Sequence, residues 1–225
     1  MIYFTGDTHG ERARFSDGKR LGDSAWTKDD YLIVCGDFGY VMYDDEAERA
    51  FLDELAKKPY TICFCDGNHE NFTTLNAYPC EVWNGGRVHK IRPNILHLMR
   101  GQIYTLQGKK IFVMGGAYSI DKATKKNQGL HWEEELPVAS EYQEAIDNLR
   151  AAAHKVDYIV SHTAPQRIIR LMGFYPDGHD AELTGFLDWV LSETAFKKWY
   201  FGHWHMDKEI TDRVRALWLD VAAEE

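Results

Sequence analysis

Short apolar runs recur along the chain and predict buried β-strands. Each run has four to seven residues, is rich in Val, Ile, Phe and Tyr, and is bounded by turn residues. Because the runs are continuously apolar and do not alternate with polar residues, we expect strands that are covered on both faces. The six runs are residues 2–5, 31–36, 61–65, 110–116, 158–162 and 199–203.

Three segments between these runs have the apolar spacing of amphipathic helices. Residues 44–59 carry acids in the first turn and lysines in the last, and they finish on a proline. Residues 140–155 begin with Ser140 and have Gln143 three positions later, which predicts a capping box. Residues 181–193 place leucines and a phenylalanine on one face.

Two glycine-containing segments predict β-hairpins. Residues 101–116 would turn near Gly108, and residues 83–91 would turn at their two adjacent glycines. Strands that alternate with helices, with hairpins inserted, indicate an α/β fold with mixed sheets. Because no linker or repeat divides the sequence, we expect a single domain over residues 1–225.

The composition narrows the class of protein and of partner. A net charge of −9, from 26 basic and 35 acidic residues, argues mildly against extended nucleic acid and favours a small substrate. No run approaches the roughly 18 apolar residues of a membrane span, and the N-terminus lacks the pattern of a signal peptide. We therefore expect no membrane partner and a cytoplasmic location, and the oligomeric state is not predicted.

The cysteines favour the same compartment. Cys35, Cys63 and Cys65 lie inside apolar runs, and no C-x-x-C pair occurs, which disfavours a zinc ribbon or a thioredoxin-like motif. We expect buried free thiols, which fit a reducing environment.

Five of the predicted strands end in side chains that can ligate metals. In α/β sheets, sites form where the carboxyl ends of strands meet. Residues two apart in an extended segment point to the same side, so each D-x-H or H-x-H pair can direct two ligands into one cavity. Each strand end alone is explained as well by a turn, a helix cap or a core histidine, whereas five together favour a site. The set is Asp7, His9, Asp37, Asn68, His162, His203 and His205.

This ligand set predicts a particular chemistry. Nitrogen and oxygen ligands without thiolate suit Mn, Fe, Zn, Ni or Co better than a structural Cys-rich zinc site. Seven ligands exceed one tetrahedral ion, and a bridging carboxylate fits two metals about 3.5–4 Å apart. Such a pair clamps a phosphoryl oxygen and activates a bridging water. We therefore predict in-line attack of a metal-bridging hydroxide on the phosphorus of a phosphoester.

The motifs resemble those of the calcineurin-like metallophosphoesterases, including compact bacterial members. The blocks D-x-H, G-D, G-N-H-[DE], a later H and G-H-x-H occur in order at residues 7–9, 36–37, 67–70, 162 and 202–205. The resemblance implies an αββα sandwich of two packed mixed β-sheets flanked by helices, and two divalent metal ions, for which we favour Mn. It implies one metal on Asp7, His9 and His205, a second on Asn68, His162 and His203, and a bridging Asp37.

The resemblance also implies a catalytic histidine. His69 would face the substrate and stabilise the transition state or protonate the leaving oxygen, with support of the Asn68 loop as the alternative. Glu70 would orient His69 or another histidine. The phosphate-binding arginines of the protein serine/threonine phosphatases are missing, and Tyr40 and Asp66 stand near their places. This argues against protein phosphatase activity.

The loop over residues 117–137 is the candidate substrate rim. It carries Tyr118 and Lys122, which we expect to contact an anionic substrate, although a solvated loop explains it equally well. The sequence thus predicts a hydrolase of a phosphodiester or phosphomonoester, of a small nucleotide type. The alternatives are a non-catalytic binding or scaffold protein on the same fold and a nuclease that acts on nucleic-acid ends. A serine hydrolase is disfavoured because no G-x-S-x-G occurs.

Overall fold

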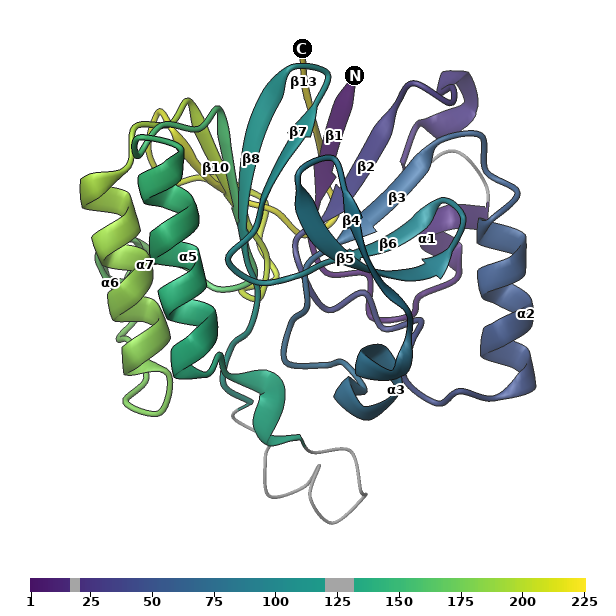
Figure 1. Ribbon diagram of the computed structural model, residues 1–225, viewed down its shortest axis with the longest axis horizontal. Helices are drawn as coiled ribbons and strands as arrows, with labels where there is room; N and C mark the ends of the chain where they lie inside the picture. The colour runs from purple at the N-terminus through teal and green to yellow at the C-terminus, as the bar shows by residue number, and fades with distance from the viewer. Residues whose placement is uncertain (17–20, 120–131) are drawn as a thin grey trace.

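Two mixed β-sheets pack face to face and carry helices on their outer sides (Figure 1). The computed structural model describes residues 1–16, 21–119 and 132–225. The seven-stranded sheet has the order β13-β1-β2-β3-β6-β5-β4, and the six-stranded sheet has the order β11-β12-β10-β9-β8-β7. The predicted α/β class with two packed mixed sheets is confirmed.

The seven-stranded sheet is parallel at its centre. Strands β1, β2, β3 and β6 run parallel, β13 pairs antiparallel with β1, and β4 and β5 form an antiparallel hairpin. The three parallel strands β1, β2 and β3 therefore place their carboxyl ends at one edge. The strand bounds are β1 Ile2–Thr5, β2 Tyr31–Val34, β3 Thr61–Phe64, β4 Cys80–Trp83, β5 Gly86–Arg92, β6 Ile95–Leu98 and β13 Val221–Glu224.

The six-stranded sheet repeats this design. Its strands β8, β9, β10 and β12 are parallel, and β7 and β11 close its two edges in antiparallel pairing. The strand bounds are β7 Ile103–Leu106, β8 Lys109–Met114, β9 Tyr158–Ser161, β10 Lys198–Phe201, β11 Lys208–Glu209 and β12 Val214–Ala216.

An apolar core fills the space between the sheets. Phe4 of the seven-stranded sheet stacks on Tyr200 of the six-stranded sheet, with ring centroids 4.4 Å apart. Cys35, Cys63 and Cys65 lie in this core as free thiols, as predicted. Because both faces of the central strands are covered, their continuously apolar sequences have a direct structural cause.

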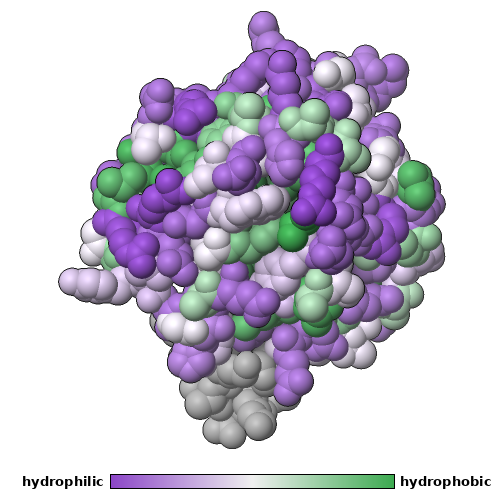
Figure 2. Space-filling view, turned by 60° about the vertical axis from the view of Figure 1, so that its left-hand side comes forward, coloured by the Kyte–Doolittle hydropathy of each residue, from purple (hydrophilic) through white to green (hydrophobic). Residues whose placement is uncertain are grey.

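Helices cover the two outer faces. The apolar sides of α2 and α3 pack on the seven-stranded sheet, and those of α5, α6 and α7 pack on the six-stranded sheet. The surface on the α5–α7 side is largely hydrophilic, with smaller apolar areas (Figure 2). Within the described ranges, no helix has the length and apolarity needed to cross a bilayer. The bounds are α1 Ala13–Ser16, α2 Glu46–Leu55, α3 Phe72–Ala77, α5 Ala139–Ala151, α6 Gln166–Leu171 and α7 Ala181–Glu193, with short 3-10 turns at Asp23–Ala25 and Glu133–Glu135.

One helix start differs from its prediction. Helix α5 begins at Ala139, and the Val138 N–H donates to the Glu141 carboxylate at 2.8 Å. The expected capping box from Ser140 to Gln143 is therefore wrong by two residues, because Glu141 supplies the reciprocal contact. Both predicted hairpins are confirmed as β4–β5 and β7–β8.

Candidate metal centre

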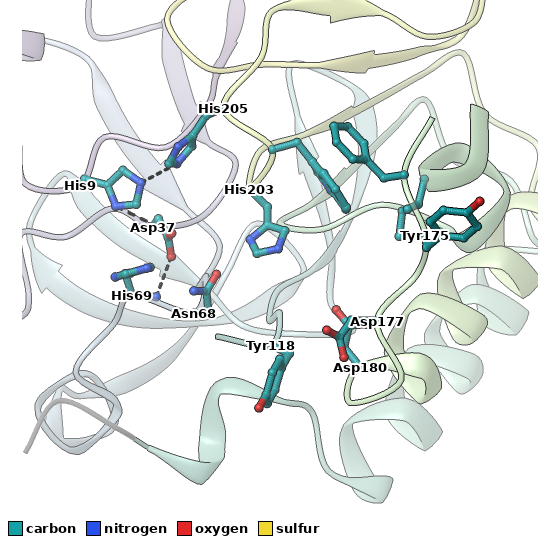
Figure 3. A pocket seen from close by; sticks show the side chains of 13 residues that line it. His9, Asp37, Asn68, His69, Tyr118, Tyr175, Asp177, Asp180, His203 and His205 are labelled. Atoms are coloured by element: carbon teal, nitrogen blue, oxygen red, sulfur yellow. Dashed lines mark hydrogen bonds and ion pairs between the residues drawn. The ribbon is translucent and has the colours of Figure 1, made fainter. Parts of the chain in front are cut away.

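The predicted ligands follow five strands whose carboxyl ends meet at one edge of the sandwich. The runs after β1, β2 and β3 come from the seven-stranded sheet, and those after β9 and β10 come from the six-stranded sheet. The run at residues 31–36 continues beyond its strand, because β2 stops at Val34 and Gly36 has a φ of 92°. The candidate ligands therefore meet at the carboxyl ends of strands, as predicted, and both sheets contribute to them (Figure 3).

Asp7, His9 and His205 form the first donor cluster. The His205 Nε2 lies 3.1 Å from Asp7 Oδ2 and 2.8 Å from His9 Nε2. Adjacent ligands on an ion with bonds of about 2.1 Å are about 3 Å apart, so these separations match a shared cation. The grouping is the one that the sequence motifs predict for one metal.

A second cluster forms around His162, which is fully buried. Its Nδ1–H donates to the Cys35 carbonyl at 2.9 Å, so in the neutral imidazole the lone pair is on Nε2. That Nε2 faces the Asn68 Oδ1 at 3.0 Å, and the Asn68 amide is oriented by its Nδ2–H donation to Ser119 at 3.0 Å. Two acceptors therefore point at each other, an arrangement that a cation bound to both would stabilise. The residues present fit a metal ion.

Asp37 lies between the two clusters. Its Oδ2 is 3.8 Å from His9 Nδ1, and its Oδ1 is 3.5 Å from His162 Nε2. The two oxygens of one carboxylate thus lie beside residues of both clusters, with Asp37 facing Nδ1 of His9 while His205 faces Nε2 of the same ring. Bridging by Asp37 is the role that the family resemblance implies. The structure also groups Asp7 with Asp37 and His162. Asp7 therefore lies close to both clusters, whereas the motifs assign it to one metal.

His203 lies beside His162, and their ring centroids are 4.9 Å apart. Burial, together with the neighbouring His162, lowers the pKa of His203 to about 3. The imidazole is therefore neutral at pH 7 and has a lone pair for a metal. In contrast, the hydrogen bond to Asp7 raises the pKa of the more exposed His205.

Glycines in the motifs make room for the carboxylates. A methyl group at Gly67 would lie 2.0 Å from Asp37 Oδ1, and one at Gly202 would lie 2.1 Å from Asp7 Oδ1. Both positions therefore exclude any side chain, because real Cβ atoms do not approach so closely. This explains why G-N-H and G-H-x-H begin with glycine.

The backbone of the site is strained at four ligand positions. His9, Asp37, His203 and His205 have φ values of 46°, 46°, 65° and 45°, in the left-handed region that disfavours side chains. Such conformations cost of order 1–3 kcal/mol each and persist only where the surrounding structure enforces them. Their concentration at the donor clusters indicates a functional site.

His69 and Glu70 both support the Asp37 loop. The His69 N–H donates to Asp37 Oδ1 at 2.7 Å, and its half-buried ring lines the cavity 5.2 Å from the His9 ring. Glu70 is fully buried and accepts a hydrogen bond from the Phe38 N–H at 2.7 Å. Burial and the charge of Asp37 raise the pKa of Glu70. The contact of Glu70 with the Asp37 loop differs from the histidine contact that we expected.

Asp66, near the place of a missing phosphatase arginine, is an internal ion-pair partner. Its carboxylate accepts from Arg100 Nε at 2.8 Å and lies 3.1 Å from His97 Nε2. Burial opposes ionisation, but Arg100 and His97 more than offset it and lower the pKa of Asp66. The sequence motifs did not single out Arg100 or His97. Tyr40, near the other missing arginine, is buried and donates to the Glu11 carbonyl at 2.7 Å.

The donor clusters open into a cavity of about 580 Å³. Tyr118, for which we predict a substrate contact, lines this cavity, and Lys122 lies outside the described residues. The segment between α6 and α7 also contributes, and no motif pointed to it. From this segment, Phe174, Tyr175, Asp177 and Asp180 line the cavity, and Ile169 of α6 and Trp204 after β10 lie with them.

Comparison with known proteins identifies the family. A family model described as calcineurin-like phosphoesterase matches residues 1–207, which contain all five sequence blocks. A search of curated proteins found no match. The match covers most of the 225 residues. The chain therefore belongs to the calcineurin-like phosphoesterase family.

Proposed function

We propose that the protein hydrolyses a small phosphoester with two bound divalent metal ions. The observation that carries this proposal is the position of Asp37, whose two oxygens face two separate donor clusters at 3.8 and 3.5 Å. A carboxylate in that position suits a bridge between two ions. The ligand chemistry fits Mn, Fe, Zn, Ni or Co, and we favour Mn.

The chain's own residues would prepare the reaction in three ways. Asp7 and Asp37 are held by backbone N–H donors, so they keep their orientation without an ion. The half-buried, neutral His203 presents a nitrogen rather than a positive charge. Bound metal ions would supply Lewis acidity for the phosphoryl oxygens and lower the pKa of an attacking water. His69 would then donate a hydrogen bond to the phosphoryl group or protonate the leaving oxygen.

The cavity favours a small substrate over long nucleic acid. Its volume of about 580 Å³ falls in the range of small-ligand sites. A non-catalytic scaffold on this fold is the less favoured alternative, because five of the seven predicted donors form two groups that share Asp7, and His69 lines the cavity. A nuclease acting on nucleic-acid ends shares the chemistry and differs in the substrate.

A panel of esters tests the proposal. The metal-free protein would be reconstituted with Mn, Zn, Ni or Mg and supplied with p-nitrophenyl phosphate, bis(p-nitrophenyl) phosphate and nucleotides. We expect hydrolysis of at least one ester class, dependent on the added metal and abolished by chelation. The absence of turnover with every metal would favour the scaffold alternative.

A further inference from the structure

The cavity has a second end, away from the donor clusters. Figure 3 shows Tyr175, Asp177 and Asp180 on the far side of His203 from His9 and His205. Tyr175, Asp177 and Asp180 belong to the connection between α6 and α7. We call this end the 174–180 subsite; it consists of Phe174, Tyr175, Asp177 and Asp180, with Trp204 beside them.

Aromatic side chains form one wall of the 174–180 subsite. Phe174 is 43 % exposed and Tyr175 is 93 % exposed, although both are large apolar groups. The Phe174 ring packs on Trp204 with centroids 4.8 Å apart. Because Trp204 lies between His203 and His205 in the chain, this wall is continuous with the donor clusters. Exposed aromatic faces beside a reaction centre are suited to stacking on a flat ring.

Asp180 gives the subsite an unused hydrogen-bond acceptor. The residue is only 6 % exposed, and its buried Oδ1 has no hydrogen-bond partner among the residues that the structure describes. Burial and the nearby Asp177 raise the pKa of Asp180 to about 6, so the carboxylate is mostly ionised at pH 7. An ionised carboxylate only accepts hydrogen bonds. A ligand with N–H donors would relieve the cost of the unpaired oxygen.

The carboxylates at this end disfavour a second phosphate group. Two carboxylates, Asp177 and Asp180, line it, and no Lys or Arg of residues 1–16, 21–119 and 132–225 lines the cavity. The Asp177 carboxylate accepts from the His179 backbone N–H at 2.8 Å and lies 2.7 Å from His179 Nδ1, so a phosphate at this end would face mainly the charge of Asp180. The lining at this end favours an uncharged, flat group with hydrogen-bond donors.

We propose that the 174–180 subsite binds the nucleobase of a nucleoside phosphoester, with its ring on the aromatic wall and its N–H donors on Asp180. This inference rests on the proposed function, because the ester itself would lie at the donor clusters. Guanine should be favoured most, since it carries two adjacent N–H donors on one edge. A phenyl group would occupy the wall but leave Asp180 unpaired.

Matched diesters test the subsite. The p-nitrophenyl esters of guanosine 5′-monophosphate and of phenyl phosphate share the chromogenic group and differ in the group offered to the subsite. For the wild-type protein with Mn, we expect kcat/KM to be about tenfold or more higher for the guanosine ester. Asp180→Asn should remove this preference by lowering kcat/KM for the guanosine ester more than for the phenyl ester.

Asp212→Asn is the matched control, because Asp212 is exposed and lies outside the cavity. It should leave both rates unchanged. The inference is overturned if the wild type does not distinguish the two esters, or if Asp180→Asn slows both equally.

Binding of guanosine without phosphate separates this inference from the proposed function. Saturation-transfer NMR should detect contact of the base protons with the wild-type protein and a loss of that contact in Asp180→Ala. Absence of contact in the wild type would overturn the subsite even if esters are hydrolysed. Failure to hydrolyse any ester, with guanosine contact retained, would overturn the phosphoesterase and leave the base site standing.

Discussion

The backbone N–H of His203 donates to both carboxylate oxygens of Asp7, at 2.9 and 3.1 Å, although the residues are 196 positions apart. The contact joins the end of β1 in one sheet to the end of β10 in the other. Asp7 is therefore oriented by the fold before any ion binds. The donor clusters depend on the packing of the two sheets and not on one loop.

Two substitutions at Asp7 should separate its roles. Asp7→Asn keeps an oxygen for the His203 N–H, whereas Asp7→Ala leaves that donor unpaired. We expect metal-free Asp7→Ala to be about 1–3 kcal/mol less stable than Asp7→Asn by denaturant unfolding. Both should bind less than two Mn per chain by elemental analysis. Equal stabilities would contradict the role of the hydrogen bonds, and undiminished Mn in both would contradict ligation by Asp7.

Gly202→Ala should damage the donor clusters by steric overlap alone. The added methyl group would lie 2.1 Å from Asp7 Oδ1, so the carboxylate or the strand end must move. We expect Mn affinity to fall about tenfold or more, measured by calorimetric titration. Gly178→Ala is the control, since a methyl group there meets nothing within 4 Å, and it should bind Mn like the wild type. Wild-type affinity in Gly202→Ala would be inconsistent with the observed close approach.

His69→Asn should separate catalysis from metal binding. The His69 ring lines the cavity, while its backbone N–H, which the substitution retains, holds Asp37. We expect kcat for bis(p-nitrophenyl) phosphate to fall about 100-fold or more, as for loss of a general acid. The Mn content should stay at the wild-type value. A loss of Mn in parallel with activity would instead favour support of the Asn68 loop.

Asp180→Asn should stabilise the protein at alkaline pH. The pKa of Asp180 is raised from 3.8 to about 6, so the folded state holds the proton more tightly than the unfolded state. Stability therefore declines as pH rises from about 4 to 6, and the full penalty remains above pH 6. We expect the metal-free variant to gain about 1–3 kcal/mol at pH 8 and nothing at pH 4 by denaturant unfolding. The same gain at both pH values would contradict the titration of Asp180.

The central strands and the donor residues were predictable because their signals are local. Continuous apolar runs mark strands buried on both faces, and Asp7 and His9 follow such a run directly. We could also predict that the donor residues meet at one edge, because sites in α/β sheets form at the carboxyl ends of strands whatever the order of those strands. The short β11 and β12 were missed, because two or three residues carry little periodicity. The strands β6 and β13 were also missed, although they are as long as β1.

The second end of the cavity could not be predicted from the sequence. Tyr175 and Asp180 lie in a turn with neither strand nor helix spacing, and only the packing of α6 beside α7 brings them to the cavity. The pairing of Asp66 with Arg100 is similarly non-local, because it links β3 to the turn after β6. Such contacts depend on tertiary structure rather than on local pattern.

Titration of the metal-free protein with Mn tests the central claim most directly. Bound Mn per chain and hydrolysis of bis(p-nitrophenyl) phosphate would be measured in the same samples. The position of Asp37 between two donor clusters predicts no activity without Mn and a maximal rate at two Mn per chain. Full activity in the presence of a chelator, or a maximal rate at one Mn per chain, would contradict the two-metal phosphoesterase.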